Sequence, residues 1–476
     1  MRVIGRLGAA VLLLGASLPL ATLATVPELP AAPLGEVIDG YVREGLRSNL
    51  ALRAQTLEVE RSLAALDAAR ARFFPRLAVE ARYTRAEGGR VIDFPTGDLL
   101  NPVYATLNEL LADAGRPAPF VPIENQVVPF LREREQDTRL TIRQPLYAPA
   151  IPAAVRAQRA QLESAQFGRI ALARRLKRDI TVAYLDWLRA SRTVDIVRAS
   201  LELLQENLRV NESLYRNGRI TQDQVLRARA ELLDVEQQLR EAQNGSAQAQ
   251  SYLNFLLNRP LSEPIQPAEV TGELRRAVAD LETLRAAALA NRPEIEQLER
   301  AVEAAESQVR IERADLLPRL SLGIDAGVQG EEYEFGRGRN FGTISLLLEW
   351  QLFDGGASRA EVRGARAAAR QAAVRRDELA QQIQLEVQQA LDRLVAATDS
   401  LATAEARAEA ARAAFRIASR KRDEGVISQV EFIDARSALT GAELNLNVTR
   451  FELLARQAEL DYATAAGTLP ADFGEL

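Results

Sequence analysis

The sequence predicts an α+β membrane protein with an internal duplication, in which short β-strands are joined to very long helices. Three observations lead to this fold class. Motifs recur 207 positions apart, apolar residues follow a heptad repeat over long stretches without proline, and four short segments alternate apolar and polar residues. The duplication predicts two equivalent halves, the heptads predict coiled-coil hairpins, and the alternation predicts the strands of a membrane β-barrel.

The composition excludes several kinds of protein. The 476 residues include 60 basic and 65 acidic side chains, and the formal net charge of −5 argues against a basic nucleic-acid binder. The chain has no cysteine and no histidine, so disulfides, Cys/His zinc sites and imidazole catalysis are impossible. An enzyme would have to rely on carboxylates, lysines or hydroxyls. We expect no catalytic residues, no metal, no cofactor and no nucleic-acid partner.

The first 24 residues have the pattern of a secretory signal peptide. Arg2 and Arg6 are followed by an apolar run over 7–20, which is shorter than the roughly 20 residues of a membrane-spanning helix. Small residues follow up to Ala24, where we expect cleavage. A buried core helix is the alternative. Because no other stretch of 18 apolar residues exists, we expect no helical membrane span.

Two large copies of one unit make up the rest of the chain. Gly218 lies in the motif Tyr-Arg-Asn-Gly-Arg-Ile-Thr and Gly425 in the similar motif Arg-Asp-Glu-Gly-Val-Ile-Ser, 207 positions later. The same offset pairs Gln144 with Gln351. A period of this length indicates a duplication and not a short-period solenoid.

The first copy carries an insertion. Pro75 and Pro318 begin similar Pro-Arg-Leu motifs that are 243 positions apart, so the first copy has about 36 extra residues. The extra residues lie between Gly88 and Gln136 and are rich in proline. We therefore expect a long loop at this place.

Each copy is predicted to contain a long helix. Apolar positions spaced alternately by four and three residues run over 180–215 in the first copy and over 383–418 in the second, in the same register. A helix from about Ala150 to Asn217 would be about 100 Å long. The helices alone are equally compatible with a structural coiled coil.

Each long helix is predicted to turn back on itself. Gly218 and Gly425 fall where a tight turn needs a residue that tolerates positive φ. Thr221 and Ser428 follow at positions suited to cap the returning helices. A heptad pattern over 225–256 supports the first return helix.

Four segments are predicted to be membrane strands, at about 77–83, 140–146, 320–328 and 344–352. Strands of about 9–11 residues with one apolar face match the dimensions of a transmembrane β-strand. Four strands cannot close a barrel, and lipid does not tolerate an open edge. We therefore expect three copies to form a barrel of twelve strands, with a soluble four-stranded sheet as the alternative. The insertion and the segment 327–342 would be extracellular loops, because the helices leave from the other end.

This order of elements resembles the TolC-like outer-membrane efflux protein family, the outer membrane factors. The resemblance covers roughly 34–469 and is carried by the two glycine turns, by Leu316-Leu-Pro-Arg-Leu and by Phe353-Asp-Gly-Gly. It implies a trimeric twelve-stranded β-barrel in the bacterial outer membrane, continued by a helical tunnel in the periplasm. It further implies a passive exit duct of a multidrug efflux or type I secretion system. The implied partners are two further copies, outer-membrane lipid, a periplasmic adaptor protein and an inner-membrane pump.

The resemblance also implies two sites at the helical turns. The adaptor would dock on 217–222 and 424–429, where the predicted contact residues are Tyr215, Gly218, Ile220, Thr221, Gly425, Ile427 and Ser428. Glu431 and Asp434 lie three apart on one helix face and would form an acidic pore constriction, whereas the first copy has Gln224 and Arg227 there. A solvated helix face that pairs with Lys421 or Arg436 is the alternative.

The predicted organisation follows from these assignments: signal peptide 1–24, first repeat 25–217, first return helix 218–259, linker and equatorial segment 260–292, second repeat 293–424, and second return helix with the C-terminal tail 425–476. Two other functions remain open at this point. A periplasmic coiled-coil adaptor would have one hairpin where this chain has two, and a structural coiled coil without a pore would leave the amphipathic strands unexplained.

Overall fold

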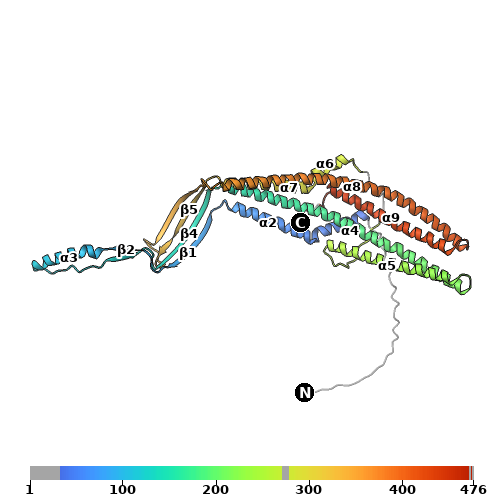
Figure 1. The fold of residues 1–476 in the computed structure, drawn as a ribbon, viewed down its shortest axis with the longest axis horizontal. Helices are drawn as coiled ribbons and strands as arrows, with labels where there is room; N and C mark the ends of the chain where they lie inside the picture. The colour runs from blue at the N-terminus through green and yellow to red at the C-terminus, as the bar shows by residue number, and fades with distance from the viewer. Residues whose placement is uncertain (1–32, 271–277, 471–472, 474–476) are drawn as a thin grey trace, which may run out of the picture.

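The computed structural model describes residues 33–270, 278–470 and 473, so the signal peptide expected at 1–24 lies outside the described residues. The molecule is elongated, with a β-sheet toward one end and two helical hairpins at the other (Figure 1). Within the described ranges, no helix combines the length and the apolar character needed to cross a membrane.

Along the chain the elements are α1 (Leu34–Ser48), α2 (Leu50–Ala71), β1 (Arg76–Arg85), β2 (Val91–Phe94), α3 (Thr96–Asp113), β3 (Gln126–Pro129), β4 (Arg134–Tyr147), α4 (Ala150–Arg216), α5 (Gln222–Leu256), α6 (Leu281–Asn291), α7 (Pro293–Ala314), β5 (Arg319–Gly330), β6 (Asn340–Glu349), α8 (Ala357–Asp423) and α9 (Gln429–Ala463).

The main sheet has the order β1-β4-β5-β6, and all neighbours are antiparallel. The insertion connects β1 to β4 and a shorter segment connects β5 to β6, as predicted. With 14 and 12 residues, β4 and β5 are longer than the expected strands. Strand β6 ends three residues before the predicted 352, because its partner β5 begins opposite Glu349. Trp350 lies beyond the strand, where its indole N–H donates to the carbonyl of Leu316 at 3.2 Å.

The two faces of this sheet differ in polarity. One register row joins Leu77, Ile142, Ile324 and Ile344 across all four strands. The neighbouring row on the opposite face joins Ala78, Thr141, Asp325 and Thr343. Alternation of side chains along each strand produces this separation.

Ion pairs cross the polar face between strands. The Arg143 guanidinium donates to both carboxylate oxygens of Asp325, at 2.9 and 3.2 Å. Asp137 is buried, pairs with Arg139 on its own strand and lies 3.6 Å from the Arg82 guanidinium on β1. Opposite charges therefore neutralise one another on a face that carries few apolar groups.

The helices next to the sheet are arranged in the same order as the strands. Helix α2 contacts α4, α4 contacts α7, and α7 contacts α8. Because α2 leads into β1, β4 into α4, α7 into β5 and β6 into α8, each strand continues into its own helix without a crossing. Farther from the sheet, α5 pairs with α4, α9 with α8, and α4 with α9 (Figure 1).

The predicted heptad seams form the interior of the helical part. Ile180, Ala183 and Val197 are buried on α4, and Val387, Ala390 and Ala404, each 207 positions later, are buried on α8. The long helices each have 67 residues and the return helices each have 35, so the duplication is preserved in length. Helix α4 spans Ala150–Arg216, in agreement with the expected helix.

Two shorter helices pack around the middle of the long ones. Helix α1 buries Tyr41 against Tyr184 of α4, with ring centroids 5.4 Å apart. Helix α6 packs on α8 and lies within the predicted linker and equatorial segment 260–292. The next residue, Arg292, is buried and pairs with Glu294 at 2.9 Å and with Glu386 of α8 at 3.0 Å. This ion pair joins the middle segment to the long helix.

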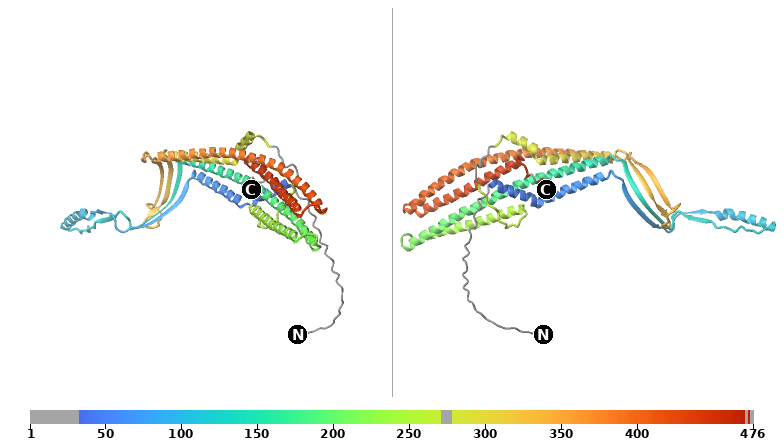
Figure 2. Two further views of the ribbon diagram at one scale, coloured as in Figure 1. Left: turned by 45° about the vertical axis from the view of Figure 1, so that its right-hand side comes forward. Right: turned by 180° about the vertical axis from the view of Figure 1, so that it is seen from behind.

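The insertion between β1 and β4 is not the plain loop that its proline content predicted. Strands β2 and β3 pair with each other, and α3 lies beyond them, farthest from the helical hairpins (Figure 2). We call this unit, residues 91–129, the arm.

Candidate pore entrance and docking turns

The two hairpin turns have the same backbone geometry. Gly218 has φ of 68° and Gly425 has φ of 72°. The N–H of Gly218 donates to the Tyr215 carbonyl, and that of Gly425 donates to the Arg422 carbonyl, both at 2.9 Å. The next N–H in each turn reaches back five residues, which completes a Schellman motif. The prediction that glycine is required here is confirmed in both copies.

The return helices are capped differently. The Ser428 hydroxyl accepts from the Glu431 N–H at 3.2 Å, and the Glu431 carboxylate accepts from the Ser428 N–H at 3.3 Å. This reciprocal pair is a capping box. Thr221 occupies the same position before α5, but its side chain makes no capping hydrogen bond. The expectation that both hydroxyls cap is therefore correct for Ser428 and wrong for Thr221.

The second tip contains a stack of aromatic rings and guanidinium groups that the first copy cannot form. The Arg422 guanidinium carbon lies 4.1 Å from the ring centroid of the buried Phe432. Phe432 packs against Phe415 at 5.7 Å, and the Arg436 guanidinium lies 5.8 Å from the Phe415 ring. The first copy has Tyr215 in place of Arg422 and aliphatic residues in place of both phenylalanines. The turn motifs show Arg422 in place of Tyr215, and Phe415 lies on the predicted seam over 383–418, but neither pattern predicts the contact of these side chains with Phe432.

The two tips also influence each other electrostatically. The pKa of Glu206 on α4 is lowered, mainly by its hydrogen bond to the Arg209 guanidinium, and the positive charge of Arg422 contributes. Asn447 on α9 donates to the carbonyl of Arg189 on α4 at 2.9 Å. The hairpins therefore lie against one another in the chain.

Glu431 and Asp434 are both exposed at the start of α9. No ion pair among the described residues joins either acid to Lys421 or Arg436, so the alternative of a paired helix face has no support from the geometry. Arg436 is buried instead, and burial lowers the pKa of its guanidinium while the Glu443 carboxylate acts in the opposite direction. Its side chain bonds to the Thr440 hydroxyl at 3.3 Å.

The predicted docking residues surround the two turns. Tyr215 is exposed, as are both glycines, Thr221 and Ser428, whereas Ile220 and Ile427 are half-buried. The structure adds two exposed apolar side chains at the second turn, Val426 and Val430. Motif comparison could not find them, because their counterparts in the first turn are Arg219 and Asp223.

The Asp-Gly-Gly segment before α8 is a strand-to-helix junction. Gly355 and Gly356 have φ of 69° and 94°, and the Asp354 carboxylate accepts from the N–H groups of Gly356 and Ser358, both at 2.8 Å. These bonds and the Ser358 hydroxyl lower the pKa of Asp354 to about 2. The carboxylate occupies the position that a bound anion would need, so the segment is a helix cap and not a phosphate site.

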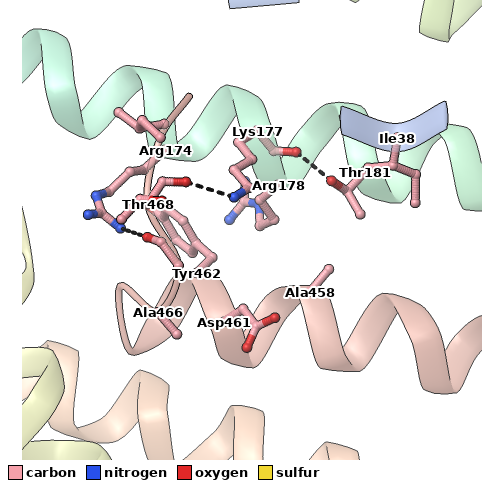
Figure 3. A pocket seen from close by; sticks show the side chains of 12 residues that line it. Ile38, Arg174, Lys177, Arg178, Thr181, Ala458, Asp461, Tyr462, Ala466 and Thr468 are labelled. Atoms are coloured by element: carbon pink, nitrogen blue, oxygen red, sulfur yellow. Dashed lines mark hydrogen bonds between the residues drawn. The ribbon is translucent and has the colours of Figure 1, made fainter. Parts of the chain in front are cut away.

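A cavity of about 210 Å³ lies between α4 and the end of α9 (Figure 3). Its basic side chains are already engaged. Arg174 donates to the carbonyls of Ala465 and Gly467 at 3.0 and 3.2 Å, and the Lys177 ammonium donates to the Thr468 carbonyl at 3.1 Å. These bonds hold the segment after α9 against α4, so the cavity belongs to a structural joint.

Comparison with known proteins points to one family. Residues 284–466 match the family model described as outer membrane efflux protein. The chain is 24% identical over 295 residues to the alkaline protease secretion protein AprF of Pseudomonas aeruginosa. That match covers 59% of this chain and 59% of the relative.

Solved structures share the fold over nearly the whole chain. The outer-membrane channel OprN has a TM-score of 0.73 and 21% identity, and the match covers 91% of this chain and 90% of that one. The CmeC outer membrane channel of Campylobacter jejuni has a TM-score of 0.75 and 17% identity, covering 93% and 88%. The open-state MtrE outer membrane channel of Neisseria gonorrhoeae has a TM-score of 0.71 and 17% identity, covering 90% and 89%.

Proposed function

We propose that the chain is a passive exit duct in the bacterial outer membrane, with a periplasmic extension, because residues 284–466 match the outer membrane efflux protein model and the chain has the fold of solved outer-membrane channels. Energy and choice of substrate would lie with an inner-membrane pump that delivers cargo through a periplasmic adaptor. The family is one of channels, in keeping with the expected lack of catalytic activity.

One observation carries this proposal: the strands and the helices attached to them lie in the same order, and both layers end at the same two edges of the chain. Within the described chain, β1 and β6 each pair on one side only, and α2 and α8 are the outer helices of the row. A row of this kind closes when β6 of one copy pairs with β1 of the next. Three copies would supply twelve strands, within the range of known barrels.

The polarity of the sheet supports closure in lipid with the polar face inside. Leu77, Val79, Ile344, Leu346 and Leu348 are exposed on one face of the edge strands. On a soluble sheet these side chains would form an unusually large apolar patch. With lipid outside, the opposite face with its Arg–Asp pairs would line a water-filled bore.

The hairpin tips would serve as the periplasmic entrance and the adaptor-docking surface. Docking would involve the turns at 217–222 and 424–429, where Tyr215, Val426 and Val430 offer exposed apolar contacts. The acids Glu431 and Asp434 would contribute six carboxylates to a trimer and make the entrance cation-selective. Like charges about 4 Å apart repel by roughly 1 kcal/mol even at the dielectric constant of water.

Two kinds of export system could deliver cargo to this duct. The secretion protein AprF among the relatives supports a type I secretion system, and the channels among the solved structures support tripartite efflux. A periplasmic adaptor or a structural coiled coil is a weaker proposal, because neither accounts for a sheet with two free edges and an exposed apolar face.

The first test is single-channel conductance of the purified protein in a planar bilayer, with wild type beside Glu431→Gln/Asp434→Asn. Glutamine can still accept the N–H of Ser428, so the cap of α9 is retained. We expect small, cation-selective steps in the wild type and a loss of cation selectivity in the double variant.

The matched control is Glu231→Gln/Asp234→Asn, which removes the same charge at the same spacing from α5. It should leave selectivity unchanged. Identical steps in all three proteins would show that the constriction lies elsewhere in the channel, and the proposal of an exit duct would still stand. The absence of conductance from a verified, folded oligomer would overturn the proposed function.

A further inference from the structure

The arm has no counterpart in the second copy, and the barrel and tunnel do not require it. It leaves the end of the sheet that is remote from the hairpins and extends away along the molecule (Figure 2). An outer-membrane duct with its hairpins in the periplasm would present this arm outside the cell. The question is what covers α3, the helix that makes up most of it.

One face of α3 is held by the segment that returns toward β3. The Asn101 side-chain amide exchanges two hydrogen bonds with the backbone of Ile123, both at 2.9 Å. Asn108 does the same with the backbone of Phe120, at 2.6 and 3.2 Å. The rings of Tyr104 and Phe120 are 5.2 Å apart. This ladder of amides fixes the orientation of the helix within the arm.

A second face of α3 is apolar and uncovered. Leu100, Val103, Leu107 and Leu110 expose 39%, 51%, 38% and 60% of their surfaces. Their spacing of three, four and three residues is that of the a and d positions of a coiled coil, and Ala114 continues the series. The arm therefore has one face used internally and one face with the pattern of a helix–helix seam.

The charges of α3 select the partner. Asp98 and Glu109 lie off the seam, at the f and c positions of this heptad. Asp113, the last residue of the helix, lies at a g position, whereas the other flanking residues Leu99, Tyr104 and Thr106 are uncharged. The helix contains no lysine or arginine, whereas helices that lie on anionic membrane surfaces carry them. The a and d positions carry no charge, so this seam suits a like copy of itself, because the side chains that would meet do not repel one another.

We propose that the seam of α3 packs against the same seam in the other two copies, so that the three arms form a short coiled coil outside the mouth of the duct. This inference rests on the proposed trimer, which places three arms around one axis. Eighteen residues are too few for a stable coiled coil in free solution. Attachment to one barrel raises the effective concentration of the three helices to about 1 mM, which favours their association.

The test uses the absence of cysteine in the natural chain, which makes an introduced thiol unique. Leu107→Cys places a thiol at an a position of the seam. The matched control Ala105→Cys places it on the same helix at an exposed f position. The purified oligomer of each variant is oxidised mildly and analysed by non-reducing electrophoresis.

We expect disulfide-linked dimers from Leu107→Cys, about fivefold more than from Ala105→Cys, because only facing thiols come within the roughly 6 Å between Cα atoms that a disulfide requires. The native mass of each sample is measured before oxidation. A trimer in which neither variant links, or in which both link equally, overturns this inference and leaves the duct intact. A sample that is not trimeric contradicts the proposed assembly itself.

Discussion

At the scale of single residues, the duplicated turns differ most clearly in their caps. Ser428 forms a capping box with Glu431, whereas Thr221 bonds only through its backbone. Glu431 would therefore have two roles, because its carboxylate supports the start of α9 and would also place negative charge at the pore entrance.

Ser428→Ala should loosen the first turn of α9. Loss of an N-cap hydroxyl costs about 1 kcal/mol, which corresponds to about fivefold faster local opening. Hydrogen–deuterium exchange of the peptide around residues 428–433 measures this change. Thr221→Ala is the control, and the matching peptide of α5 should change little, because no side-chain cap is lost there. Equal effects in the two helices would contradict the structural difference.

At the scale of elements, the junction between β6 and α8 depends on one carboxylate. The pKa of Asp354 is lowered to about 2 by the hydroxyl and N–H groups that its carboxylate accepts from. A lowered folded-state pKa means that the carboxylate stabilises the junction above its unfolded pKa of about 3.9, and that this stabilisation is lost as the pH falls through about 2.

We expect the first turn of α8 to lose protection from hydrogen exchange between about pH 4 and about pH 2, after correction for the intrinsic exchange rate. In Asp354→Asn the same turn should be less protected at pH 5 and nearly independent of pH below that. A wild-type turn whose protection does not change over this interval would show that the carboxylate has no part in holding the helix start.

The elements also show which parts of the fold the sequence could predict. The heptad positions from Ile180 to Leu204 repeat over many turns, and such a long pattern averages out local exceptions. The structure of the arm was not predicted. It depends on hydrogen bonds from the side chains of Asn101 and Asn108 to the backbone of Ile123 and Phe120, and no repeating sequence pattern marks such pairs. Proline in this segment indicated a loop, yet Pro102 lies within α3.

The candidate site was predictable to a similar extent. Gly218 and Gly425 could be found because positive φ restricts the residue type strongly. The stack of Arg422, Phe432 and Phe415 could not be found, because it joins residues from two helices whose relative rotation the sequence does not specify. The failure of Thr221 to cap has the same origin, since a suitable residue type does not determine its rotamer.

At the scale of the whole molecule, the free edges β1 and β6 predict a closed ring of three. One cysteine is placed at Val79 on β1, and a second at Ile344, Leu346 or Leu348 on β6, in three double variants. Oxidation of at least one variant should link neighbouring copies into dimers and trimers.

The linked ladder should stop at three chains, because a closed ring leaves no free edge. The single-cysteine variants, which cannot form a continuous ring of disulfides, are the control. A ladder that extends beyond three chains would indicate an open filament, and one that stops at two would indicate a different closure.

The equal helix lengths constrain how this gene can change. The long helices have 67 residues each and the return helices 35 each, so both tips of a chain end at one level. Removing one residue from either long helix would withdraw its tip by about 1.5 Å and turn it by about 100°. A ring of six tips would then no longer be flush. An insertion or deletion in one long helix should therefore be matched by one of the same length in the other, in steps of whole heptads. The length of the arm does not affect the level of the tips, so it is free to vary.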